Sequence, residues 1–189
     1  MALGGDHTSQ SVFIYDSNGN HLIDTVVKFH DKDEKYLQVS TMPGSLKVND
    51  DCKLLILSTP APCEYMGKVK KVGGNLLIAM FQGHTKENRS ATRYNINTFA
   101  VIDTLFTDGK PYQLHTPVRV ILLNISTSGV RFRAPFYSFD DGDIFEILLD
   151  IKNSKKRLIA QVINHVDREP AASDYGCRFI ESAQNGSKL

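Results

Sequence analysis

Residues 118–133 read VRVILLNISTSGVRFR, two short β-strand patterns separated by a polar turn. The run 118–123 is mostly apolar and rich in β-branched residues, and apolar residues return at Val130 and Phe132. The Asn, Ser, Thr and Gly between them are residues that tight turns use. The stretch therefore predicts a β-hairpin whose tip spans residues 124–129.

The same pattern continues in both directions along the chain, and no stretch shows the period of an amphipathic helix of three turns. Turn signals such as Asn18-Gly19 separate the candidate strands. The expected strands are residues 12–15, 21–29, 36–40, 52–58, 64–72 and 75–81, followed by 97–106, 118–125, 130–133, 145–151, 156–166 and 175–180. Two sets of short strands predict an all-β chain built from two small antiparallel domains in tandem, each a barrel or a sandwich.

A polar stretch divides the two sets of strands. Residues 82–93 contain Gly83, and their single apolar residue before Tyr94 is Ala91. Such composition is typical of a linker between domains. We therefore expect a first domain at residues 1–84 and a second at 85–189, with the linker at 85–93 opening the second.

Composition limits the classes of partner. The 189 residues carry 22 Lys and Arg against 21 Asp and Glu, a net charge of +1, which argues against a general binder of DNA, RNA or anionic membranes. The longest apolar runs are far shorter than a membrane span, and the first residues lack a secretory pattern. Three Cys without CxxC spacing fit reduced thiols. We expect a soluble cytoplasmic protein with no membrane insertion.

Two motifs carry the functional signal. Arg89 and Arg93 form an RxxxR pair in the expected linker, and a guanidinium can donate paired hydrogen bonds to a phosphate or to the O6/N7 edge of guanine. Asn124 and Ser126 fall on one face of a strand end, and Gly129 permits a turn and a close approach of a ligand. Each motif alone is an ordinary solvated linker or capped turn. Their order and the gap of about 30 residues make the combination much more specific.

Catalysis has little support in the sequence. The six His lack the spacing of a metal site, the acidic residues 140–143 fall in an expected solvated turn, and no Ser or Cys has a recognisable nucleophile setting. We therefore expect no enzyme activity, no metal and no cofactor. A β-barrel that binds single-stranded nucleic acid stays an alternative, because four aromatic residues offer stacking surfaces. They are Tyr36, Tyr94, Tyr112 and Phe132.

RxxxR followed by [Asp/Asn]-x-Ser-x-x-Gly resembles the signature of the PilZ domain, a bacterial receptor module for cyclic di-GMP. The similarity covers residues 85–181 and includes the Asp-Gly-Asp at 141–143 and the closing strand at 175–180. The first half resembles, less specifically, the N-terminal barrel of two-domain, YcgR-like members. The resemblance implies a split-barrel-like domain followed by a PilZ barrel.

The resemblance also implies a site. Arg89 and Arg93 would grip guanine edges and phosphates, Asn124 and Ser126 would hydrogen-bond a guanine, and Gly129 would hold the turn. Further contacts are expected from Arg131, Gly176 and Arg178.

The implied function is that of a cyclic di-GMP effector whose domains change their arrangement when the ligand binds. The output would be motility or exopolysaccharide and biofilm formation, through a protein partner such as a flagellar motor or switch component or a polysaccharide synthase. The alternative within the family is a PilZ-like scaffold for proteins that binds no nucleotide.

Overall fold

The computed structural model describes residues 10–31, 36–72, 74–81, 91–151, 153–168 and 170–181. These residues form twelve β-strands. The strands are β1 (Ser11–Asp16), β2 (His21–Asp31), β3 (Tyr36–Val39), β4 (Asp51–Ile56), β5 (Cys63–Val72), β6 (Asn75–Phe81), β7 (Tyr94–Thr107), β8 (Lys110–Ile125), β9 (Gly129–Pro135), β10 (Ile144–Ile151), β11 (Ser154–Arg168) and β12 (Ala172–Phe179). Within the described residues, no helix is long and apolar enough for a membrane crossing.

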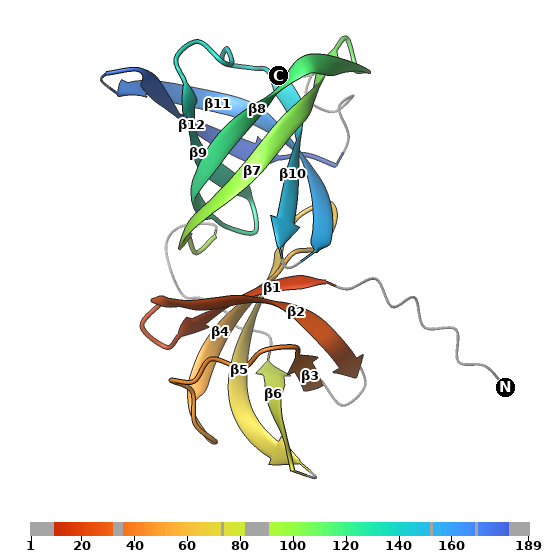
Figure 1. Ribbon diagram of the computed structural model, residues 1–189, viewed down its shortest axis with the longest axis vertical. Helices are drawn as coiled ribbons and strands as arrows, with labels where there is room; N and C mark the ends of the chain where they lie inside the picture. The colour runs from red at the N-terminus through yellow and green to blue at the C-terminus, as the bar shows by residue number, and fades with distance from the viewer. Residues whose placement is uncertain are drawn as a thin grey trace, which may run out of the picture.

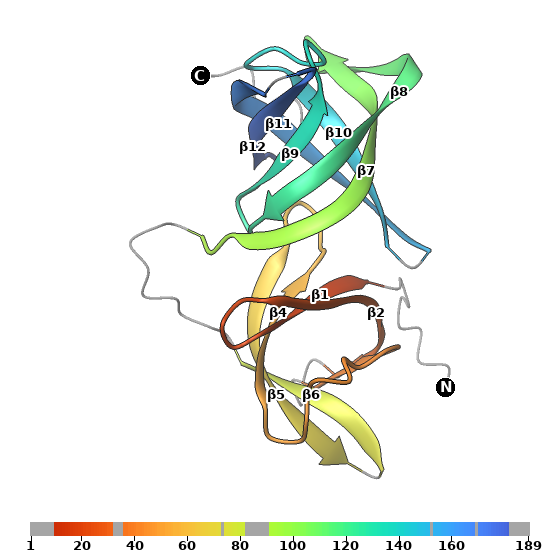
Figure 2. The ribbon, with the colours of Figure 1, turned by 60° about the vertical axis from the view of Figure 1, so that its left-hand side comes forward.

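The strands close into two antiparallel barrels that follow one another along the chain. The strand order is β1-β2-β3-β6-β5-β4 in the first and β10-β11-β12-β9-β8-β7 in the second. The barrels are stacked along the long axis of the molecule (Figures 1 and 2). The expected all-β class and the tandem of two barrels are confirmed. The expected boundary between residues 84 and 85 lies outside the described residues and stays a prediction.

Each expected strand has a counterpart, but the β7–β8 hairpin is longer than the sequence indicated. β7 begins at Tyr94, and β8 begins at Lys110. The hairpin turns at Asp108 and Gly109, whose φ angles of 51° and 73° fit a type I′ turn. Most residues from 110 to 117 are exposed on both faces of the strand. The alternation that marks a half-buried strand is therefore missing from this part of the sequence.

The interior of the second barrel is built around aromatic rings that contact one another, one pair stacked and another edge to face. Phe132 on β9 lies 5.2 Å from Tyr175 on β12 and 5.6 Å from Phe145 on β10, measured between ring centroids. All three side chains are fully buried. These contacts fix β9 and β12 side by side, and the outer faces of these two strands carry the site described below.

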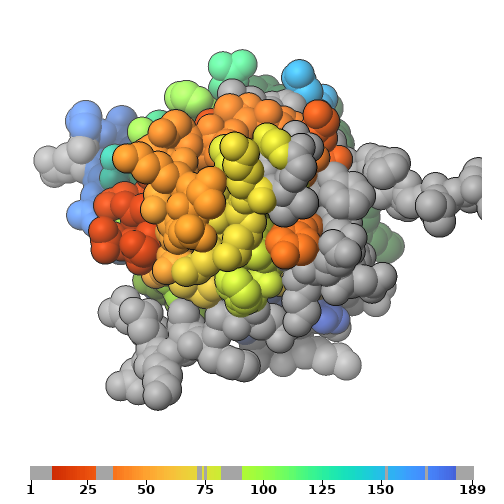
Figure 3. All heavy atoms as spheres, turned by 90° about the horizontal axis from the view of Figure 1, so that it is seen from below, coloured from red at the N-terminus to blue at the C-terminus, as the bar shows by residue number. Residues whose placement is uncertain are grey.

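β1 contributes side chains to the cores of both barrels. Val12 and Ile14 pack in the first barrel, whereas Phe13 and Tyr15 belong to the hydrophobic cluster of the second. The Tyr15 ring lies 4.5 Å from the ring of Tyr94, at the start of β7. In Figure 1, β1 lies on the side of the first barrel that faces the second. Viewed from below, the first barrel fills the centre of the outline, and parts of the second are visible around its edge (Figure 3). The first barrel keeps a core of its own, and side chains on the outer face of β1 extend the core of the second barrel into an apolar interface.

Candidate ligand-binding site

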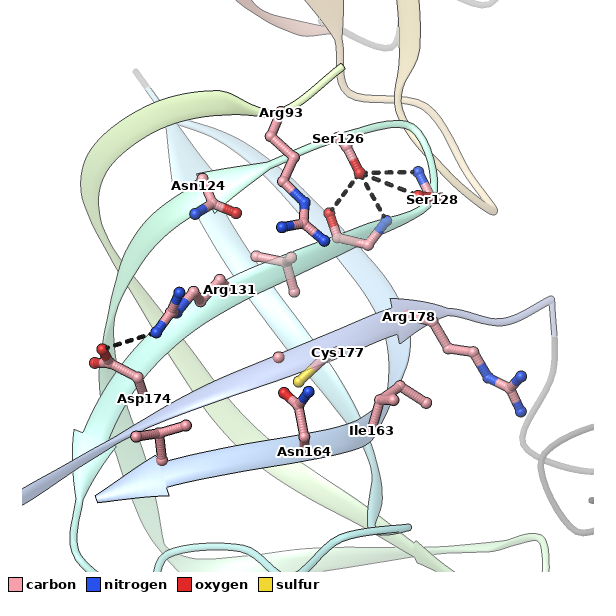
Figure 4. A pocket seen from close by; sticks show the side chains of 14 residues that line it. Arg93, Asn124, Ser126, Ser128, Arg131, Ile163, Asn164, Asp174, Cys177 and Arg178 are labelled. Atoms are coloured by element: carbon pink, nitrogen blue, oxygen red, sulfur yellow. Dashed lines mark hydrogen bonds and ion pairs between the residues drawn. The ribbon is translucent and has the colours of Figure 1, made fainter. Parts of the chain in front are cut away.

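A cavity of about 420 Å³ opens on the side of the second barrel. Strands β8, β9, β11 and β12 supply its walls, and Arg93 reaches it from the segment that precedes β7 (Figure 4). Seven of the eight site residues expected from the sequence line this cavity: Arg93, Asn124, Ser126, Gly129, Arg131, Gly176 and Arg178. The eighth, Arg89, lies outside the described residues. The structure thus brings Arg93 of the first motif together with the three residues of the second.

The Ser126 hydroxyl organises the turn between β8 and β9. Its oxygen accepts hydrogen bonds from the amides of Ser128 and Gly129, each at 3.2 Å, and donates to the Gly129 carbonyl at 3.3 Å. The Ser126 amide donates to the same carbonyl at 2.9 Å. The Ser128 hydroxyl lies 3.2 Å from the same oxygen. A hydroxyl has one donor and two acceptor sites, so the contacts within the turn fill its capacity. The principal role of Ser126 here is to shape the turn that borders the cavity.

Position 129 requires glycine for a different physical reason from the one expected. Its φ lies outside the left-handed region, so the turn itself does not demand a glycine. A Cβ at this position would lie only 2.1 Å from the carbonyl oxygen of Cys177 on β12. Glycine is therefore required because β9 and β12 approach each other too closely for a side chain.

Asp174 gathers three arginine side chains at one end of the cavity. Arg133 Nε donates to Asp174 Oδ1 at 2.7 Å, and Arg131 and Arg168 each lie 3.2 Å from Oδ2. Asp174 is only 4% exposed. Burial opposes ionisation of this carboxyl, but the bonds from Arg133 and Arg168 outweigh it and hold its pKa below the usual value. The cluster therefore keeps a surplus of positive charge.

Arg93 and Arg178 add two further guanidinium groups to the cavity. No described residue forms an ion pair or hydrogen bond with the exposed Arg93. Arg178 donates to Gln161 Oε1 at 2.8 Å, whereas its buried Nε has no partner among the described residues. Forked donors in a cavity that also holds carboxamides suit a ligand with phosphates and base edges.

A second cavity, of about 390 Å³, adjoins the first at the junction between the barrels. Pro60 and Ala61 wall it from the first barrel, and Thr127 and residues 178–181 wall it from the second. Ser128 and Arg178 line both cavities.

Sequence reasoning missed several residues of the cavity, chiefly Asn164 on β11 and Asp174 on β12. Asn164 follows Val162 and Ile163, two successive β-branched residues that interrupt the strand alternation. The pairing of β11 with β12 shifts register at this point, as a β-bulge does. The broken alternation was the available signal. No sequence signal marked Asp174, because its arginine partners lie on β9 and β11 and only strand pairing brings them to it.

The aromatic residues considered for nucleic-acid stacking are not all accessible. Tyr94 and Phe132 are buried in the hydrophobic interior. Tyr112 is exposed, but it lies on the β7–β8 hairpin and outside the cavity lining. Neither cavity contains the row of exposed rings on which successive bases of a single strand stack.

Comparison with known protein families finds the PilZ domain, matched at residues 87–188. No curated protein sequence matches the chain at a significant level.

Among solved structures, the chain is similar to YcgR from Escherichia coli in complex with c-di-GMP, at 14% identity over 95% of this chain and 80% of that one, with a TM-score of 0.37. MotI/DgrA, the inhibitor of motility of Bacillus subtilis, shows 11% identity over 98% of this chain and 93% of that one, with a TM-score of 0.34. MrkH of K. pneumonia in complex with c-di-GMP shows 12% identity over 94% of this chain and 82% of that one, with a TM-score of 0.35. TM-scores this far below 0.5 do not establish a common arrangement of the whole chain.

The family match does not depend on those structures. It spans more than half of the chain and contains β7 to β12, which form the second barrel. Both sequence motifs and the larger cavity also lie within it. The chain therefore belongs to the PilZ domain family.

Proposed function

We propose that this protein is a cyclic di-GMP receptor of the bacterial cytoplasm that performs no chemistry on its ligand. The observation that carries the proposal is the convergence of Arg93, Asn124, Arg131 and Arg178 on one cavity of a PilZ domain. A dinucleotide offers two phosphates and two guanines, which match forked cations and carboxamides.

In this proposal each side chain has a distinct task. Arg93 has no described partner, so its guanidinium is available to a phosphate or a guanine edge. Arg89, four residues earlier, supplies the second fork of the motif. Asn124 hydrogen-bonds a guanine from β8, while Ser126 and Gly129 hold the backbone that borders the ligand.

We further propose that the ligand changes the arrangement of the barrels. Arg178 and Ser128 line both the candidate site and the cavity at the junction, where Pro60 and Ala61 belong to the first barrel. A ligand that draws Arg178 toward its phosphates alters the junction cavity at the same time. The ligand shifts the equilibrium only as far as it prefers one arrangement over the other. The altered surface would then act on motility or exopolysaccharide output through a protein partner.

Isothermal titration calorimetry tests the nucleotide proposal. We expect cyclic di-GMP to bind with a Kd below tens of micromolar, and GMP and cyclic di-AMP to bind far more weakly. Arg93→Ala should weaken binding at least tenfold, because a charge-assisted hydrogen bond contributes roughly 1.5–3 kcal/mol. Small-angle scattering with and without the ligand tests the change of arrangement.

Arg119→Ala is the matched control, because Arg119 is an exposed arginine on β8 that does not line the cavity. Absence of cyclic di-GMP binding by the unaltered chain would overturn the proposal in favour of the protein scaffold. A strongly salt-dependent gel shift with single-stranded nucleic acid would favour the other alternative.

A further inference from the structure

Four residues of the second barrel form a row across its outer surface. The strand pairing places Asn124 on β8 opposite Arg131 on β9, Arg131 opposite Gly176 on β12, and Gly176 opposite Asn164 on β11. All four residues line the larger cavity. Neighbouring strands are about 4.8 Å apart, so the two asparagines are separated by about 14 Å along the sheet. A carboxamide thus stands at each end of the row.

Both asparagines are placed by the same structural device. The pairing of β8 with β9 shifts register between Leu122 and Asn124, and that of β11 with β12 shifts between Val162 and Asn164. Each asparagine therefore follows directly after a residue inserted in its strand. A β-bulge of this kind re-aims the side chains that follow it. In Figure 4, Asn124 and Asn164 lie on opposite sides of the cavity.

Gly176 makes room for Asn164. A Cβ on Gly176 would lie 2.5 Å from Asn164 Oδ1, so the carboxamide rests against the bare backbone of β12. This approach is a close contact, and no described residue forms a hydrogen bond with the side chain of Asn164. The carboxamide therefore presents a free acceptor and two free donors to the cavity.

We infer that Asn164 is a specificity-determining residue that reads the second guanine of the ligand, from the wall opposite to Asn124. The inference rests on the proposed binding of cyclic di-GMP. Guanine presents donors and acceptors on its edges, and a carboxamide can match a pair of them. The two asparagines hydrogen-bond the two bases, while the arginines between and beside them bind the phosphates.

Titration of the full chain with cyclic di-GMP and with cyclic GMP–AMP tests this assignment. The two ligands share their phosphates and differ in one base. Asn164→Ala should weaken cyclic di-GMP binding roughly tenfold, because a lost hydrogen bond leaves a polar group of the base unpaired. The mixed dinucleotide should lose much less, so the preference for cyclic di-GMP should shrink.

Asn95→Ala is the matched control. Asn95 pairs with Asn124 on the same row, is exposed on β7 and lies outside the cavity lining. Gly176→Ala should reproduce the effect of Asn164→Ala, because the added methyl displaces the carboxamide. Thermal unfolding of each variant reports whether the barrel is intact.

The outcomes separate this inference from the proposed function. If the unaltered chain binds cyclic di-GMP and Asn164→Ala binds it equally well, the assignment of Asn164 is wrong and the receptor proposal stands. An equal loss for both ligands means a contact outside the bases and also overturns the assignment. If the unaltered chain binds neither dinucleotide, the receptor proposal fails first.

Discussion

Asp174 holds one negative charge against three arginines at the edge of the candidate site. Its carboxylate bonds Arg133 through two atoms and also reaches Arg131 and Arg168. The arginines are between 39% and 50% exposed, so they retain much of their hydration. The carboxylate is buried, and its charge is stable only because the arginines surround it. Asp174 therefore fixes where Arg131 lies relative to the cavity.

Asp174→Asn should lower the free energy of unfolding at pH 7 by about 1–3 kcal/mol, because charge-assisted hydrogen bonds are replaced by weaker ones. The pKa of Asp174 is lower in the folded protein than the value of about 3.9 in an unfolded chain. Its ionisation thus contributes stability above that value, and the contribution is lost as the pH falls through the folded-state pKa. Urea unfolding at pH 7 and at decreasing pH should show the gap between the variant and the unaltered chain narrowing in acid.

Asp150→Asn provides the control, because Asp150 is exposed on β10 and no ion pair of it is described. It should change stability by less than about 0.5 kcal/mol. A gap for Asp174→Asn that stays constant down to acid would show that the charge is not what stabilises the cluster.

At the scale of single residues, the sequence identified the motif positions and missed their partners. Arg93, Asn124 and Arg178 were expected at the site and line its cavity. Asp174 and Asn164 were not expected, because their places depend on strand pairing and on two bulges. A motif describes residues that are close in the chain, whereas the pairing of β9 with β12 places Arg131 beside Asp174, 43 positions away. The place of Asn164 depends on the pairing of β11 with β12.

Among the elements, the turn from residue 126 to 129 joins fold and site most directly. One buried hydroxyl satisfies two backbone amides and one carbonyl. The Phe179 amide donates to the Ser128 carbonyl at 2.9 Å, which ties the turn to the end of β12. The turn therefore holds both cavities in shape.

Ser126→Ala should lower the free energy of unfolding by about 1–3 kcal/mol, because two amide donors lose their acceptor. Binding of cyclic di-GMP should weaken as well, since the turn that borders the ligand loosens. Chemical unfolding and calorimetry measure the two effects on the same samples.

Ser128→Ala is the control for the turn, because it keeps the backbone donor and removes an exposed hydroxyl whose described hydrogen bond is to Ser126 Oγ, at 3.2 Å. We expect a change below about 0.5 kcal/mol. Equal losses for both variants would contradict the role assigned to the Ser126 hydroxyl.

The elements themselves were largely predictable. Strand patterns and turn residues located every strand, with errors at the ends. The largest error was in the β7–β8 hairpin, where residues 110–117 are exposed and carry no alternation. The register of strand pairing could not be predicted from the sequence, because a bulge changes the face of the sheet on which each later residue lies.

On the scale of the whole molecule, the barrels are joined by an apolar interface. Phe13 and Tyr15 from β1, with Leu55 and Leu57, belong to the same buried cluster as the core of the PilZ barrel. The hydroxyl of Ser11 also donates to the Ser154 carbonyl at 3.4 Å. An interface this apolar couples the stability of its two halves.

Differential scanning calorimetry should therefore show a single unfolding transition, with equal calorimetric and van't Hoff enthalpies. Phe13→Ala removes a buried ring from the shared cluster and should separate the transition into two. Val12→Ala, the neighbouring change inside the first barrel, should shift one undivided transition to a lower temperature. Two resolved transitions in the unaltered chain would show that the barrels unfold independently.

The two faces of β1 also set a rule for recombination. A recombination event in the gene between the two barrels would separate the PilZ barrel from Phe13 and Tyr15. The ring of Tyr94 would then be exposed to solvent. A new neighbour would have to supply an apolar strand in the place of β1 before the transplanted barrel became soluble and rigid. Although the fold consists of two barrels, we expect the two to be exchanged between genes as a single unit.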